Sequence, residues 1–148
     1  MSQAAVRDRC HARGPYPWTM KTSRNPETIA APLGRYVHQI EIENPQKLLF
    51  IAGQDGMRPD GSVPEGAVEQ LGVALENVLR NVEAAGMDAS DLVKITTYVV
   101  AGAELDPARR RSEMERLLGD HVPTSTLVFV AGLAGPQYKV EIDGWAAR

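Results

Sequence analysis

The chain has 148 residues, of which 43% are hydrophobic and 24% charged, and its formal net charge is −3. A chain of this length has room for one domain with a full hydrophobic core, and none for a second domain of ordinary size. The single cysteine, Cys10, excludes an internal disulfide and a multi-cysteine metal site, which favours a reducing, cytoplasmic location. A sequence pI near 5.6 argues against general attraction to nucleic acid or to anionic membranes.

The first part of the chain differs in charge from the rest. Residues 1–26 have a net charge of +4, and the remaining residues have a net charge of −7. Prolines in this stretch disfavour an amphipathic targeting helix, and it holds no apolar run long enough for a signal peptide or a membrane span. We expect residues 1–30 to form a basic, flexible extension before one domain at 34–148. Met20 is a candidate for the true start of translation.

The start of this domain shows two strand patterns. In residues 36–43, YVHQIEIE, the isoleucines alternate with polar and charged residues, which is typical of a β-strand. A more apolar run, LLFIAG, begins at Leu48, and Asn44-Pro45 between the two runs indicates a turn. We therefore expect the two strands to form a hairpin. Residues 54–63 contain three turn dipeptides and predict a loop with at most a brief strand in it.

Helical periodicity appears twice in the rest of the domain. Between Pro64 and Gly86, which mark a helix start and stop, apolar residues recur at spacings of three and four. A shorter helix is expected over 107–118, with Asp106 as its N-cap and Gly119 as its C-terminal stop. Runs rich in β-branched or alternating residues predict three further strands, over 92–100, 126–131 and 138–146.

The order of these elements is that of an α+β fold with both helices on one face of a sheet. The predicted strands carry apolar residues on both of their sides, so we expect the second face of the sheet to be buried as well. A small domain achieves this most economically by self-association into a closed homo-oligomer, in which a ligand pocket lies between subunits.

The sequence holds none of the strong ligand or catalytic motifs, such as a Gly-rich phosphate loop, a nucleophile elbow or a zinc pattern. Its three histidines are scattered, so we expect no metal and no cofactor. The run Arg109–Arg111 is expected to be a solvated helix face paired with Glu113 and Glu115 rather than a nucleic-acid contact. Few aromatic residues are present for base stacking. We expect neither nucleic acid nor a membrane as a partner.

Several fragments in one order resemble the RidA family of enamine/imine deaminases, also called YjgF. The resemblance runs from about Gly34 to Ala147, through GRY, LLFIAGQDGMRPDGSVPEG, LENVLRNVEAAG, DLVKITTYVV and VPTSTLVFVAGLAGPQYKVEID. It implies a chorismate-mutase-like α+β fold, with a mixed six-stranded sheet and two helices on one face. It also implies a homotrimer with a central barrel, and a small-molecule ligand in the cleft between subunits.

The resemblance fails at one position of the implied site. In deaminating members of the family, an arginine before the penultimate strand holds the carboxylate of the substrate, in a Pro-Ala-Arg-Ser pattern. Residues 123–126 here read Pro-Thr-Ser-Thr, so Ser125 stands in the place of the arginine. A hydrogen bond to a charged group contributes about 1.5–3 kcal/mol, so losing the arginine lowers the affinity for a carboxylate by roughly one to two decades.

The other site residues implied by the resemblance are present or have close substitutes. Glu141 corresponds to the family glutamate that positions the hydrolytic water, and Tyr36 to the family tyrosine; we expect both to be catalytic. Residues 52–54 replace the family's Ser-Gly-Gln and are expected to contact the substrate, as Ala52, Gly53 and Gln54.

Two arginines are candidates to replace the missing charge. Arg111 falls where many family members have a cleft asparagine; the alternative is that it is one more solvated arginine of its run. Arg35, beside Tyr36, is the second candidate. His38 is expected to be a hydrogen-bonded polar residue, with a proton carrier in the cleft as the alternative.

Two functions follow from these observations. The first is hydrolysis of reactive enamine or imine intermediates to a carbonyl compound and ammonia. The alternative is a non-catalytic trimeric module that binds a metabolite or partner and has lost deaminase activity with the arginine.

Overall fold

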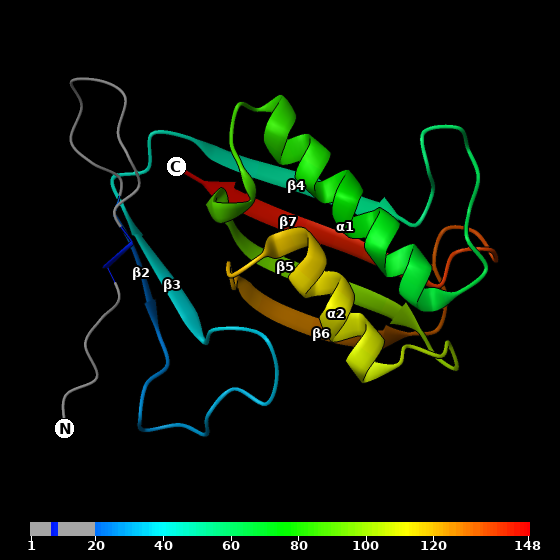
Figure 1. Cartoon of the computed structure of the whole chain (residues 1–148), viewed down its shortest axis with the longest axis horizontal. Coiled ribbons are helices and arrows are strands. Elements are labelled where there is room, and N and C mark those ends of the chain that lie inside the picture. The colour runs from blue at the N-terminus through cyan, green and yellow to red at the C-terminus, as the bar shows by residue number, and fades with distance from the viewer. Residues whose placement is uncertain (1–6, 9–19) are drawn as a thin grey trace.

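Two α-helices pack side by side on one face of a four-stranded sheet (Figure 1). The computed structural model describes residues 7–8 and 20–148. The strands lie in the order β4-β7-β5-β6; β5 and β6 are parallel and the other neighbours are antiparallel. The elements are β4 (Leu48–Asp55), α1 (Ala67–Ala84), the short 3₁₀ helix η1 (Ala89–Asp91), β5 (Leu92–Val100), α2 (Pro107–Leu118), β6 (Thr124–Val130) and β7 (Val140–Ala147).

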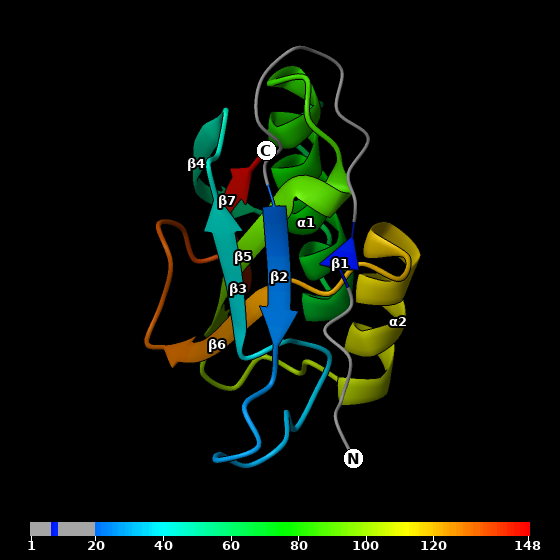
Figure 2. The ribbon, with the colours of Figure 1, turned by 90° about the vertical axis from the view of Figure 1, so that its left-hand side faces the viewer.

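A second, three-stranded antiparallel sheet stands across one end of the first (Figures 1 and 2). Its strands are β1 (Arg7–Asp8), β2 (Met20–Arg24) and β3 (Gln39–Glu43), in that order. Parts of the predicted N-terminal extension thus lie in β1 and β2, while Cys10 falls outside the described residues.

The α+β class, the mixed sheet and the placement of both helices on one face are as predicted (Figure 2). The grouping of the strands differs, because β3 pairs with β2 along five residues and not with β4. The predicted hairpin between these two strands, and with it a single six-stranded sheet, is therefore not formed within this chain. In the loop after β4, residues 56–63 hold no strand.

Contacts with the end of the main domain account for this position of β2. The Nζ of Lys21 donates to the Oδ1 of Asp91 at 2.6 Å, and the side chain of Asp91 is fully buried. The other oxygen of Asp91 accepts from the backbone N–H of Asp88, so the carboxylate is satisfied on both sides. A buried charge is strongly destabilising without its partner, so this pair fixes β2 to the start of β5.

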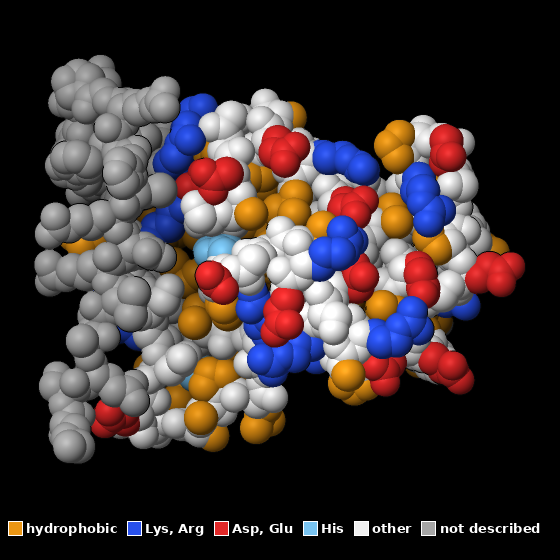
Figure 3. Space-filling view, in the orientation of Figure 1, with side chains coloured by type: hydrophobic (Ala, Val, Ile, Leu, Met, Phe, Trp, Pro, Cys, Tyr) orange, Lys and Arg blue, Asp and Glu red, His pale blue; other side chains and the backbone are white. Residues whose placement is uncertain are grey.

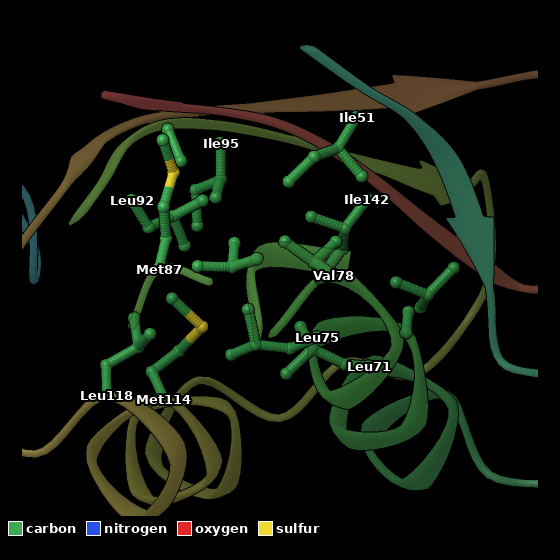
Figure 4. Packing of buried hydrophobic residues seen from close by; sticks show 14 of the residues in the cluster. Ile51, Leu71, Leu75, Val78, Met87, Leu92, Ile95, Met114, Leu118 and Ile142 are labelled. Carbon is green, nitrogen blue, oxygen red and sulfur yellow. The ribbon is translucent and has the colours of Figure 1, made fainter. Parts of the chain in front are cut away.

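The hydrophobic core lies between α1 and the sheet, with α2 closing one side (Figure 4). The buried face of α1 repeats at the spacing that the sequence predicts, through Leu71, Leu75, Val78 and Val82. The helix approaches the strands closely: a Cβ added at Gly144 of β7 would come within 3.4 Å of Val78. This close packing makes the sheet a rigid base for the side chains on both of its faces.

A buried glutamine ties two loops to the start of α1. The side-chain amide of Gln70 donates to the carbonyl oxygens of Pro64, at 2.7 Å, and Gln137, at 2.9 Å, while its oxygen accepts from the N–H of Lys139 at 2.7 Å. All of its polar atoms are used, as a fully buried amide requires. The loops before α1 and before β7 are thereby held together.

Candidate functional site

A pocket of about 480 Å³ opens between α2, the neighbouring strands β5 and β6, and the segment that precedes β3. We call it the α2 pocket. Its walls are largely apolar, and include Leu71, Met114 and Leu127. Its polar lining residues are Arg35, Tyr36, Thr97, Arg110, Arg111 and Ser125. Four of the side chains predicted for the site, at positions 35, 36, 111 and 125, thus meet in one pocket.

Arg35 lines the pocket, but its guanidinium is already engaged. Its Nη2 donates to the carbonyl oxygen of Gly119, and to that of His121 at 3.1 Å. Both acceptors lie just beyond α2, where unpaired carbonyls carry the negative end of the helix dipole. Arg35 therefore stabilises the end of α2 and holds the adjacent Tyr36 against the pocket.

Tyr36 is held by contacts within its own segment. Its hydroxyl accepts from the N–H of Leu33 at 3.3 Å, and its ring packs edge-on against His38 with centroids 5.6 Å apart. The Nε2 of His38 lies 2.8 Å from the carbonyl oxygen of Ala30. His38 is thus a hydrogen-bonded polar residue that supports Tyr36, and it is not among the lining residues of the α2 pocket.

The arginines of α2 differ in their partners. Arg111 pairs with Glu115 one turn later, at 2.9 Å, and its side chain is 67% exposed. Arg109 pairs with Glu69 of α1 at 2.5 Å, outside the α2 pocket. The expected partner Glu113 pairs instead with Arg116. Basic and acidic side chains are accordingly interspersed over the helical face of the molecule (Figure 3).

Glu141 lies on the other side of the sheet from the α2 pocket. It is opposite Tyr98 of β5 and Asp55 of β4 in the strand register. Gly53 makes room for its carboxylate at a bulge in β4: a Cβ at Gly53 would fall 1.7 Å from the Oε1 of Glu141. Gln54 folds back, so that its Nε2 donates to the carbonyl oxygens of Ala52 and Gly53.

The surroundings of Glu141 favour its protonated form. Burial raises the pKa of Glu141, and the nearby negative charges of Asp55 and Asp143 raise that pKa further. Burial also raises the pKa of Asp55, whose Oδ1 has no hydrogen-bond partner. The hydroxyl of Tyr98 donates to Asp143 at 2.9 Å. A carboxyl group in such a setting exchanges a proton closer to neutral pH than an ordinary glutamate does.

The predicted site residues therefore form two groups. The α2 pocket holds positions 35, 36, 111 and 125, and the second group, Ala52, Gly53, Gln54 and Glu141, lies at the bulge of β4 and along β7. The first group offers positive charge and hydroxyls for a bound ligand, and the second offers a carboxyl group for proton transfer. Within one copy of the chain the sheet lies between Ser125 and Glu141.

Three residues beside these groups were not identified from the sequence. Thr97 lines the pocket from a nearly fully buried position, and Arg110 lies on its helical wall. Asp55 of β4 is the register partner of Glu141 on the adjacent strand β7. The spacing of Arg110 from Pro107 and Met114 places the three residues on one side of the helix, and this pattern in the sequence could have indicated that Arg110 lines the pocket. Asp55 gave none, because the bulge that aligns it with Glu141 is not visible in the sequence.

The sheet face that carries Glu141 also exposes large apolar side chains. Phe50 and Trp145 are 66% and 54% exposed, and their rings meet edge-on with centroids 5.1 Å apart. Val128 of β6 is also exposed on this face. An apolar area of this kind on a sheet is typical of a surface that another protein covers.

Neither a metal cluster nor a membrane span is found in the described part of the chain. In residues 7–8 and 20–148, no three His, Cys, Asp or Glu side chains come together as metal ligands. No helix there is both long and apolar enough to cross a bilayer.

The chain is similar to known proteins over most of its length. The family model described as Endoribonuclease L-PSP matches residues 27–148. A RutC family protein of Haemophilus influenzae is 38% identical over 128 residues, covering 82% of this chain and 93% of that protein. The 2-iminobutanoate/2-iminopropanoate deaminase of Escherichia coli K12 is 32% identical over 127 residues, covering 82% and 94%. The structure of the Rid family protein YyfB from Yersinia pestis superposes with a TM-score of 0.76 at 25% identity, covering 86% of this chain and 98% of that one.

Proposed function

Because the chain belongs to the RidA (YjgF) family, we propose that it hydrolyses reactive enamine or imine intermediates to a carbonyl compound and ammonia. The observation that carries the proposal is the carboxyl group of Glu141, seated against Gly53 with a raised pKa. The name of the Escherichia coli relative, a 2-iminobutanoate/2-iminopropanoate deaminase, supports 2-imino acids as the substrate class.

Glu141 is the proposed catalytic base. Its carboxylate orients a water molecule and takes one of its protons as the water oxygen adds to the carbon of the protonated imine, which gives a carbinolamine. The carboxyl group returns that proton to the amine nitrogen. It then accepts the proton of the carbinol hydroxyl as the C=O bond forms, the C–N bond breaks and ammonia leaves, and it releases this proton to solvent. A group that both accepts and donates works best when its pKa lies near the operating pH, and the raised pKa of Glu141 supports this role.

The α2 pocket is the proposed binding site for the rest of the substrate. Its apolar walls suit an aliphatic side chain, and its arginines suit the carboxylate. We propose that Tyr36 and Ser125 contact the bound substrate and that Arg35 positions Tyr36. Ser125 provides no positive charge, so we propose that an arginine of α2 supplies it. The sequence indicates Arg111 as the candidate for this role.

We propose that the complete site forms between copies of the chain in a homotrimer. The two groups of site residues lie on opposite faces of the sheet, so a second copy is needed to bring them together. The exposed apolar side chains Phe50, Val128 and Trp145, on the face that carries Glu141, support such an assembly. The net charge of −7 on residues 27–148 favours a small-molecule substrate over RNA, and the single cysteine supports a cytoplasmic location.

A non-catalytic binding module is the second candidate. The observation that favours it is Ser125, which provides no charge where deaminating relatives of the family have arginine. Such a module would hold a ligand in the α2 pocket without accelerating its hydrolysis.

The deciding experiment measures ammonia release from 2-iminobutanoate that a threonine dehydratase generates in the same cuvette. The wild-type protein is expected to accelerate release above the rate in buffer. Glu141→Ala is expected to lose about 10²–10⁴-fold of that acceleration, the usual contribution of a general base. A wild-type rate equal to that of buffer would support the binding module instead.

A further inference from the structure

Arg110 is a partly buried arginine of α2 that lines the α2 pocket. We propose that Arg110 binds the carboxylate of a 2-imino or 2-oxo acid with a branched aliphatic side chain in the α2 pocket. This inference rests on the proposed function for the class of acid. It differs from the sequence-based expectation, which selected Arg111.

Arg110 is set apart by its lack of a counter-ion. Its neighbours Arg109 and Arg111 pair with Glu69 and Glu115, and Arg116 pairs with two further glutamates of α1 and α2. Within residues 7–8 and 20–148, Arg110 has no carboxylate partner, and its backbone N–H donates to the carbonyl oxygen of Asp106 at 2.9 Å.

The position of Arg110 on the helix turns it toward the pocket. It lies three residues after Pro107 and four before Met114, and these spacings place all three on one side of α2. Met114 is buried in the core, whereas Arg109 and Arg111 have exposed side chains. Arg110 is partly buried. A cation that loses water without gaining a counter-ion is unfavourable, so an anionic ligand at this position stabilises it.

The lining of the pocket defines the rest of the ligand. No aspartate or glutamate lines it, so an anion meets no repulsion from the described walls. The hydroxyls of Thr97 and Ser125, on adjacent strands, can hydrogen-bond the carboxylate or the neighbouring carbonyl or imine group. Leu71 and Leu127 provide apolar contact for a side chain. A volume of about 480 Å³ leaves room for a branched aliphatic group beyond the reacting carbon.

Calorimetric titration of the full chain with 4-methyl-2-oxopentanoate tests this assignment. Arg110→Gln is expected to weaken binding by about 10–100-fold, as for the loss of one charged hydrogen-bonding pair. Arg109→Gln is the matched control, because Arg109 is the preceding residue, pairs with Glu69 and lies outside the pocket. It is expected to bind within about threefold of wild type, since an exposed ion pair contributes little. Arg110→Lys, which keeps the charge without the planar fork, is expected to recover part of the affinity.

Two other ligands test whether the pocket recognises a carboxylate rather than an uncharged group or another anion. The uncharged 4-methyl-2-oxopentanamide is expected to bind equally weakly to wild type and to Arg110→Gln. Inorganic phosphate is expected to compete poorly with the oxo acid. Phosphate binding as tight as that of the oxo acid would overturn the carboxylate assignment. So would a larger loss in Arg111→Gln than in Arg110→Gln, or a wild-type protein that shows no saturable binding.

The outcome for Arg110 can be distinguished from that for the deaminase proposal. Arg110-dependent binding without ammonia release refutes the deaminase and leaves the anion site in place. Ammonia release with unchanged kcat/KM and unchanged binding in Arg110→Gln refutes the role of Arg110 and leaves the deaminase. Thermal unfolding of each variant, expected to match wild type within a few degrees, excludes loss of folding as the cause.

Discussion

Ser125 and Glu141 lie on opposite faces of the same four-stranded sheet. In the strand register Ser125 is opposite Ile95, and Glu141 is opposite Tyr98. Residues 95 and 98 are three apart on β5, and side chains alternate along a strand, so the two positions point away from each other. The helices cover the face of Ser125, whereas the face of Glu141 exposes Phe50 and Trp145. Within one copy of the chain the sheet separates the two side chains, and this separation is the basis for the proposed site shared between copies.

Gly53→Ala is expected to displace the carboxylate of Glu141. The added Cβ would lie 1.7 Å from its Oε1 and 2.6 Å from its Cδ, so the side chain has to move. Because a misplacement of about 1 Å can cost about 10²-fold in rate, we expect kcat/KM for ammonia release to fall on the order of 10–100-fold. Gly132→Ala is the control, since its Cβ would meet nothing within 4 Å. Equal rates in the two variants would contradict the placement of Glu141.

Ser125→Arg is expected to restore the charge that the family resemblance implies at this position. Ser125 faces the α2 pocket, where a guanidinium can reach a bound carboxylate. If the protein is a deaminase, we expect KM for 2-iminobutanoate to fall by about one to two decades. If the wild type is a binding module, the variant should gain ammonia release that the wild type lacks. Reduced activity in the variant would show that the pocket accepts a ligand of different chemistry.

Glu141→Gln is expected to stabilise the fold at neutral pH. Because the folded-state pKa of Glu141 is raised above the usual value of 4.5, the folded chain binds more protons than the unfolded chain between the two pKa values. The free energy of unfolding contributed by this group therefore falls as pH rises through that window. Urea unfolding should show Glu141→Gln more stable than wild type at pH 8, with the difference shrinking as the pH falls and disappearing below pH 4.5. A difference independent of pH would contradict this account.

Lys21→Met is expected to weaken the attachment of the three-stranded sheet. The substitution leaves the fully buried carboxylate of Asp91 without its cation, which costs about 3 kcal/mol. The control is Arg24→Met, because Arg24 of the same strand pairs with Glu41 at an exposed position. That variant should lose less than about 1 kcal/mol in the free energy of unfolding. Equal losses in the two variants would indicate that Asp91 is not buried by this contact.

The sequence predicts best those helices and strands whose apolar or β-branched residues follow one clear helical or strand pattern. The strand over 92–100 and the helix over 107–118 have the predicted bounds, because β-branched residues and clear helix end signals coincide there. Residues 20–24, MKTSR, carry no apolar alternation, so β2 was not predicted. Its position depends on the Lys21–Asp91 pair, which joins residues 70 apart and leaves no local pattern.

The sequence predicts several residues of the candidate site, but it does not predict how the fold arranges them. The family resemblance named Tyr36, Ser125 and Arg111, and the fold brings them to one pocket. It selected Arg111 over the adjacent Arg110 by position alone, because the burial and ion pairing of each arginine depend on how the helix is turned against the sheet. Burial and ion pairing, which are properties of the fold, make that distinction.

Complementation between two inactive variants tests most directly whether the site is shared between copies. One variant carries Glu141→Ala, and the other carries Tyr36→Phe with Arg110→Gln in the α2 pocket. If each site combines the pocket of one copy with Glu141 of another, the separately purified variants should be inactive. Co-assembly in equal amounts should then restore about a quarter of the wild-type ammonia release, since one site in four pairs two intact halves. Inactivity of the co-assembled mixture would contradict the shared site.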